Sequence, residues 1–346
     1  MDNPILVEAL RGDACESMHR GAVAVVDADG ARVASLGDIR RHVFPRSAVK
    51  VLQALPLVES GAADRLGLDD EALAVACASH GGEPAHTAVV ERMLGKAGLD
   101  ASALECGTQW PSQERAARAL AAAGKEASAL TNNCSGKHAG FLCVACRMHE
   151  GADLRRFVAG YVRPEHPVMR TVTAALQAAT GCDLAQVPRG TDGCSIPTYA
   201  IPLENLALAF ARVGTGRGLA PGHAAAAQRL RRAVARHPFM VAGSGRFDTR
   251  VVERLGERVF CKVGAEGVFC AALPAQGLGV AIKIDDGNNA RAAEVVMAAV
   301  IERFVRLDDA EAGFMRGLSD VALRNWNGIE VGALRATAEL RRRLDA

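Results

Sequence analysis

The distribution of strand-like segments along the chain constrains its fold more than any other sequence feature. Residues 5–12 and 21–37 are strand-like, and the second segment turns at Asp27-Ala28-Asp29-Gly30, which is typical of a hairpin. Much later, residues 258–288 contain short β-like runs separated by glycine-rich turns, which predicts antiparallel strands. Helical segments dominate the middle of the chain. We therefore predict an α+β fold, with an antiparallel sheet built from both chain ends and helices packed around it.

Helix signals define the region between these strands. The segment 83–98 begins beside Pro84 and ends at Gly98, both of which are favoured at those positions. Further helices are predicted at 137–150, 164–180, 204–213 and 289–307, with a Gly/Pro-rich break at 214–222. We predict a single catalytic domain over residues 1–346, with a helical insert at roughly 80–215, and a solvated edge element at 333–344.

The composition is typical of a globular enzyme. Hydrophobic residues make up 49% of the 346 residues, charged residues 23%, and the net charge is +2. Lysines and arginines are scattered and aromatic residues reach only 4%, so no nucleic-acid partner is expected. The N-terminus lacks signal-peptide features and no apolar run is long enough to span a bilayer, which predicts a cytoplasmic protein without a membrane partner.

The ten cysteines are expected to be reduced, because the chain is long and shows no secretion signal. Most lie in apolar segments, where cysteine behaves as a small hydrophobic residue. Cys143-x-x-Cys146 followed by His149 resembles a metal-binding motif, but its helical spacing favours buried core. Cys134 and Cys194 lie in polar loops instead, where together they could hold a soft metal such as zinc.

The segment FPRSAVK, residues 44–50, places Ser47 three positions before Lys50 at the start of a predicted apolar helix. At this spacing the two side chains share one helix face. Burial among apolar neighbours lowers the pKa of a lysine, which can then accept a proton from the serine. The pattern is consistent with an activated serine nucleophile, and equally with a capping serine beside a surface lysine.

A second lysine supports the first interpretation. Lys262 is followed by Val263-Gly264 on a predicted strand, and S-x-x-K together with K-T-G marks β-lactamases and penicillin-binding proteins. The S-D-N element of those enzymes is absent in that form. Ser79, in ASHGGEP, is either a turn residue or a second active hydroxyl.

Two polar loops offer groups for ligand recognition. Residues 131–142, TNNCSGKHAGFL, include Asn133, Lys137 and His138 just before an apolar helix. Residues 191–199, TDGCSIPTY, include Asp192. Both loops suit a small polar ligand better than a helix cap alone.

Six ordered motifs together resemble one family. They are FPRSAVKVLQALPLVESGAADRLGL, ACASHGGEPAHTAVVERML, NNCSGKHAGFL, DGCSIPTYAIPL, AGSGRFDT and KVGAEGVF with GVAIKIDDGNNAR. In this order, over about residues 5–310, they resemble the Rhizobium etli-type L-asparaginases, also called class 3 or asparaginase II-like. The resemblance implies a fold similar to serine β-lactamases and penicillin-binding proteins. It also implies a homodimer that hydrolyses L-asparagine to L-aspartate and ammonia.

The same resemblance implies roles for individual residues. Two serine–lysine pairs are expected, Ser47 with Lys50 and Ser79 with Lys262, with Ser47 as the nucleophile. A zinc site is expected at the positions Cys134, Lys137 and Cys194, with Asp192 nearby; whether catalysis requires zinc is left open. The polar side chains Arg46, Asn133, His138 and Asp192 are candidates for substrate binding.

Two alternatives stay open at this point. The first is a glutaminase or another serine–lysine amide hydrolase on the same fold. The length of the substrate side chain would distinguish a glutaminase from an asparaginase. The second is a non-catalytic zinc or amino-acid sensor, against which the presence of both serines and both lysines argues.

Overall fold

The computed structural model describes residues 3–345 and divides into two compact units. The first unit contains the segments up to Ala48, Ala200–Arg217, and from Cys261 onward. The second unit contains Val49–Tyr199 and Gly218–Phe260. The predicted insert at roughly 80–215 falls mostly in the second unit, and the single catalytic domain stays a prediction.

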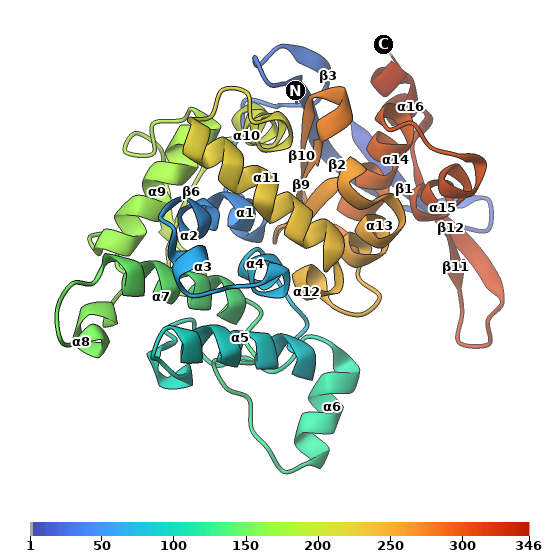
Figure 1. Cartoon of the computed structure of the whole chain (residues 1–346). Helices are drawn as coiled ribbons and strands as arrows, with labels where there is room; N and C mark the ends of the chain where they lie inside the picture. Colours follow the sequence, from blue (N-terminus) through green and yellow to red (C-terminus); the bar gives the residue numbers. More distant parts are fainter. Residues whose placement is uncertain (1–2, 346) are drawn as a thin grey trace. The chain divides into compact units, whose positions relative to one another are not determined.

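The first unit is built on an eight-stranded sheet that joins both ends of the chain. Its strands are β1 (Ile5–Arg11), β2 (Ala14–Asp27), β3 (Arg32–Leu36), β8 (Phe260–Val263), β9 (Val268–Leu273), β10 (Leu278–Ile284), β11 (Asp320–Arg324) and β12 (Glu330–Ala336). The order is β11-β12-β1-β2-β10-β9-β8, with β3 paired to β2, and the described pairings are antiparallel. Figure 1 shows β2, in blue, beside the orange β10. The predicted α+β fold with a sheet from both chain ends is confirmed.

The register at the centre of this sheet explains its strand sequences. Val23 pairs with Ile282 and Val25 with Val280, and all four side chains are buried. Helix α10 (Leu203–Thr215) packs against β10 so closely that a Cβ at Gly279 would lie 1.9 Å from the carbonyl oxygen of Ala207. Glycine is therefore required at this position for the helix to approach the sheet.

Three further α-helices belong to the first unit: α14 (Glu294–Phe304), α15 (Asp309–Ser319) and α16 (Ala338–Asp345). The prediction of a solvated edge element at 333–344 is wrong. Strand β12 pairs on both sides, and Leu340 and Leu344 of α16 are buried because this helix packs against β1 and α14.

The second unit is mainly helical. Its helices are α1 (Lys50–Gln53), α2 (Leu55–Glu59), α3 (Ala62–Arg65), α4 (Asp70–Ala76), α5 (Pro84–Lys96), α6 (Glu114–Ala122), α7 (Ser135–Met148), α8 (Leu154–Val158), α9 (Pro167–Thr180), α11 (Pro221–Arg236), α12 (Phe239–Ala242) and α13 (Phe247–Leu255). It also contains a small hairpin, β5 (Arg189–Thr191) with β6 (Pro197–Tyr199). Two short strands of the first unit, β4 (His42–Val43) and β7 (Ile201–Pro202), form a separate pair.

Two features relate to expectations from the sequence: the state of the cysteines and the presence or absence of helices that could span a membrane. All ten cysteines are free, and Cys143 is fully buried within α7, as predicted for a core residue. Between residues 3 and 345, no helix combines the length and apolar character that a bilayer crossing requires.

Candidate active site

The segment that contains Ser47 has an unusual backbone. Ser47 is half-buried in the 3₁₀ turn Arg46–Val49, and Lys50 begins α1 directly after it. Arg46 has φ = 51°, in the left-handed region that residues other than glycine rarely adopt. Such strained conformations concentrate at functional sites, where the surrounding structure maintains them.

Within the first unit, this segment lies against the strand that carries Lys262. A Cβ at Gly264 would lie only 2.6 Å from the carbonyl oxygen of Pro45, so the two backbones are in close contact. Lys262 is fully buried on β8, and its Nζ donates to the carbonyl oxygen of Val263 at 2.8 Å. The first unit thus brings Lys262 and the segment leading to Ser47 to neighbouring positions.

In the second unit, Lys50 is buried among oxygen atoms. Its Nζ lies 2.5 Å from the carbonyl oxygen of Ala78, 3.0 Å from Oγ of Ser79 and 3.3 Å from the carbonyl oxygen of Asn133. Burial lowers the pKa of Lys50, although Cys134 acts in the opposite direction. A lysine in this environment reaches its neutral, basic form more readily than one in water.

The three contacts indicate how a neutral Lys50 would be oriented. A neutral amine has two N–H donors and one lone pair. Carbonyl oxygens only accept hydrogen bonds, so the two donors would point to Ala78 and Asn133. The lone pair would then be available to the hydroxyl of Ser79, which is the geometry a general base requires.

A buried sulfur–nitrogen cluster lies beside Lys50. Cys134 precedes the first residue of α7, and Cys194 lies on the turn between β5 and β6. Nζ of Lys137 is 3.0 Å from Sγ of Cys194. A hydrogen bond from Cys194 holds the pKa of Cys134 well below its ordinary value, and Lys50 and Lys137 act in the same direction against burial.

The other two members of the cluster shift accordingly. The hydrogen bond to Cys134, followed by burial, raises the pKa of Cys194. Burial would lower the pKa of Lys137, but the sulfurs of Cys134 and Cys194 outweigh it and raise this pKa. These shifts favour the thiolate form of Cys134, the thiol form of Cys194 and the ammonium form of Lys137.

The donor set is compatible with zinc, provided that protons leave. Two sulfurs and one nitrogen are ligands that zinc accepts, and they are buried at one point of the second unit. Among residues 3–345, no group of three His, Cys, Asp or Glu side chains could hold a metal, so Lys137 would have to supply the third ligand. Zinc would have to displace the protons of Lys137 and Cys194.

His138 is buried next to this cluster with one nitrogen available. The hydroxyl of Tyr161 accepts from the backbone N–H of Glu105 and keeps one proton to donate, which Nδ1 of His138, 2.6 Å away, is placed to accept. The proton of the neutral imidazole is then on Nε2, which has no hydrogen-bond partner among the described residues. Burial, Lys137 and Lys50 lower the pKa of His138 well below its ordinary value, so it is a neutral donor.

The remaining predicted site residues lie on loops of the second unit. The backbone N–H of Asn133 donates to Oε1 of Gln109, which fixes the loop before α7. Asp192 is half-buried in the β5–β6 turn, which Ser195 closes with φ = 75°. The second unit therefore gathers the residues Lys50, Ser79, Asn133, Cys134, Lys137 and Cys194. Arg46, Ser47 and Lys262 belong to the first unit.

His80 has a structural role that was not predicted from the sequence. Its Nδ1 accepts from the backbone N–H of Gly82, so Nε2 donates to Oγ of Ser135 at 2.9 Å. Oγ of Ser135 in turn donates to the carbonyl oxygen of Leu130. His80, the residue after Ser79, is thus hydrogen-bonded to Ser135 at the beginning of α7. The only sign of this role in the sequence was its position before two glycines.

Comparisons with known proteins add one assignment. A sequence model of the L-asparaginase II family matches residues 7–336. Curated proteins give no match. A crystal structure of a β-lactamase from Mycobacterium bovis is 14% identical, with a TM-score of 0.41 over 83% of this chain and 95% of that chain. A crystal structure of Mglu is 16% identical, with a TM-score of 0.35 over 79% of this chain and 64% of that chain.

Proposed function

Since the chain belongs to the L-asparaginase II family, we propose that it is an enzyme of the Rhizobium etli type that hydrolyses L-asparagine to L-aspartate and ammonia. The observation that carries this proposal is the environment of Lys50. This side chain is buried, its pKa is lowered by burial, and it contacts the hydroxyl of Ser79 at 3.0 Å. A buried lysine next to a serine can remove the hydroxyl proton without a histidine.

In the proposed reaction, Oγ of Ser47 attacks the side-chain amide carbon of asparagine while Lys50 takes the hydroxyl proton. The tetrahedral intermediate expels ammonia, which leaves with a proton from the lysine, and an aspartyl ester remains on the serine. Water then hydrolyses this ester with the same lysine as base. Three positions separate Ser47 from Lys50, across the turn that the strained residue Arg46 begins.

Ser79 is a second candidate for the nucleophile. The specific observation in its favour is the 3.0 Å contact with Nζ of Lys50, whose lone pair would face its hydroxyl. With Ser47 as nucleophile, Ser79 would instead relay the proton, and Lys262 would support it as the second lysine.

The polar groups around the cluster are proposed to recognise the substrate. Asparagine carries an α-carboxylate, an α-ammonium and a neutral amide. Arg46 could pair with the carboxylate, and Asp192 with the ammonium group. Asn133 and the Nε2–H of His138 offer neutral hydrogen bonds to the amide. A neutral His138 adds no charge repulsion to this arrangement.

Zinc is proposed to bind at Cys134, Lys137 and Cys194. When bound, zinc would act as a Lewis acid that polarises a substrate oxygen or fixes its orientation. We also propose a cytoplasmic homodimer, which light scattering coupled to size exclusion would test for the assembly state.

The test of the function is ammonia release from L-asparagine and L-glutamine, measured side by side with wild-type protein, Ser47→Ala and Ser79→Ala. The proposal expects turnover of L-asparagine above L-glutamine, with loss of covalent acyl-enzyme in Ser47→Ala. Acyl-enzyme formation that persists in Ser47→Ala and disappears in Ser79→Ala would assign the nucleophile to Ser79. If neither amide releases ammonia, the function is wrong.

A further inference from the structure

The second unit, which is mainly helical, contains a pocket that the proposed reaction does not use. The pocket has a volume of about 600 Å³, within the range of ligand sites in proteins. Its walls come from α9, the loops before and after it, and the β5–β6 hairpin. The lining residues are Pro164, Glu165, Arg170, Thr173, Ala174, Gln177, Leu184, Ala185, Val187, Arg189 and Tyr199. None of these belongs to the proposed active site.

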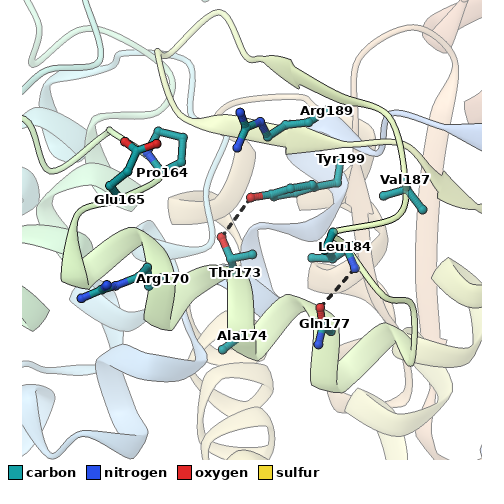
Figure 2. A pocket seen from close by; sticks show the side chains of 11 residues that line it. Pro164, Glu165, Arg170, Thr173, Ala174, Gln177, Leu184, Val187, Arg189 and Tyr199 are labelled. Atoms are coloured by element: carbon teal, nitrogen blue, oxygen red, sulfur yellow. Dashed lines mark hydrogen bonds between the residues drawn. The ribbon is translucent and has the colours of Figure 1, made fainter.

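The pocket has a charged side and an apolar side. Figure 2 shows Glu165 and the guanidinium group of Arg189 towards one side, and Leu184 and Val187 towards the other. The ring of Tyr199 lies between them. This division suits a ligand that has one charged group and one apolar part.

Hydrogen bonds fix the walls of the pocket. The hydroxyls of Thr173 and Tyr199 are 3.4 Å apart, which connects α9 to β6. The backbone N–H of Leu184 donates to Oε1 of Gln177 at 3.1 Å, which holds the following loop against the same helix. A pocket whose walls are held in place loses little conformational entropy when a ligand binds.

The two arginines are the strongest indication of a ligand. Neither guanidinium of Arg170 or Arg189 has an ion-pair or hydrogen-bond partner within residues 3–345. Exposed arginines elsewhere, such as Arg65 and Arg147, are also unpaired within residues 3–345, so the indication is that these two arginines line one pocket. Two unpaired guanidinium groups against one carboxylate, Glu165, leave the pocket with net positive charge, and planar guanidinium groups match carboxylate and phosphate oxygens.

We propose that this pocket binds a small organic anion, with a carboxylate or phosphate at the arginines and an apolar body against Leu184, Val187 and Tyr199. Glu165 lies on the charged side, where its carboxylate partly offsets the attraction of the two arginines for an anion. The site does not depend on the proposed function, because none of its residues takes part in the hydrolysis.

Isothermal titration calorimetry with phenylacetate, phenyl phosphate and the neutral phenylacetamide tests the proposal. At least one of the two anions is expected to bind, more weakly as salt concentration rises, and phenylacetamide is expected not to bind. The anion that binds more tightly identifies the preferred head group. Absence of binding by both anions, or equal binding by phenylacetamide, would overturn the proposal.

Variants localise the binding. Arg170→Gln and Arg189→Gln are each expected to raise the dissociation constant of the anion roughly tenfold, and Glu165→Gln is expected to lower it. The side chains of all three are exposed, so these variants are expected to fold. Arg342→Gln, an exposed arginine on α16, is the matched control and is expected to leave binding unchanged. Equal binding by wild type, Arg170→Gln and Arg189→Gln would exclude this pocket.

Discussion

Nζ of Lys50 lies 3.0 Å from Oγ of Ser79, although the sequence resemblance pairs Lys50 with Ser47 and Ser79 with Lys262. The contact joins the segment between α4 and α5 to the first residue of α1 within one compact unit. Lys50 is therefore in contact with one of the two serines and three positions along the chain from the other. This position makes it the residue on which the proposed chemistry most depends.

The first prediction concerns Lys50→Met, which keeps the length and apolar stem of the side chain but removes the amine. Turnover of L-asparagine is expected to fall by about 10²–10⁴-fold, the usual contribution of a general base. The measurement is kcat from ammonia release, with circular dichroism to establish folding. Lys96→Met, at an exposed lysine of α5, is the matched control and should retain activity. Wild-type kcat in folded Lys50→Met would exclude Lys50 as the base.

The fold was predictable where the sequence pattern is local and strong. Strands at both chain ends and helices between them give the sheet, because β2 and β10 are apolar enough to pair at its centre. The end of the chain was not predictable. Its many arginines indicate a solvated edge element, but Leu340 and Leu344 are buried against the rest of the unit. Two residues are too weak a signal against that charge.

The candidate site was predictable as a set of residues and not as a set of contacts. Polar side chains in glycine-rich loops indicate a site, and Ser79, Cys134 and Cys194 were selected on that basis. Which of them meet depends on tertiary packing, which loop sequences do not encode locally. The role of His80 was missed for the same reason, because its partner Ser135 is 55 positions away.

The second prediction concerns the pH dependence of stability. Burial lowers the pKa of His80 well below its ordinary value of 6.5, with His86 and Lys50 acting in the same direction. As the pH falls below about 6.5, the unfolded chain takes up a proton that folded His80 does not, so the free energy of unfolding decreases. Above this pH the decrease caused by protonation of this histidine in the unfolded chain is absent. The expected slope is up to about 1.4 kcal/mol per pH unit for one histidine.

Urea denaturation between pH 5 and 8 measures this slope. His80→Gln preserves an acceptor for Gly82 and a donor for Ser135, and should flatten the slope by the share of one histidine. A slope in His80→Gln equal to that of wild type would show that His80 does not contribute.

The third prediction concerns zinc. Cys194→Ser removes the sulfur that contacts both Lys137 and Cys134, so zinc content after equilibration with a zinc buffer is expected to fall at least about tenfold. Mass spectrometry of the dialysed protein measures the metal. Cys182→Ser, at a half-exposed cysteine of the same unit, is the control and should match wild type. Full zinc content in Cys194→Ser would place any bound zinc elsewhere.

The fourth prediction concerns the contact between Gly264 and Pro45. In Gly264→Ala the added Cβ would lie 2.6 Å from the carbonyl oxygen of Pro45 and 3.1 Å from Cβ of Val268. Neither neighbour is the flexible end of a long side chain, so the backbone before Ser47 must shift. We expect the free energy of unfolding to fall by about 1–3 kcal/mol, as for other overpacked positions.

Urea denaturation of Gly264→Ala beside Gly313→Ala provides the comparison. Gly313 lies inside α15 with open space around its Cα, so alanine there should stabilise the protein by about 0.5–1 kcal/mol. The two substitutions add the same methyl group and are expected to act with opposite sign. The shifted backbone in Gly264→Ala also leads directly to Ser47, so kcat for L-asparagine should fall in that variant alone. If Gly264→Ala is as stable and as active as Gly313→Ala, the strand that carries Lys262 does not position the segment before Ser47.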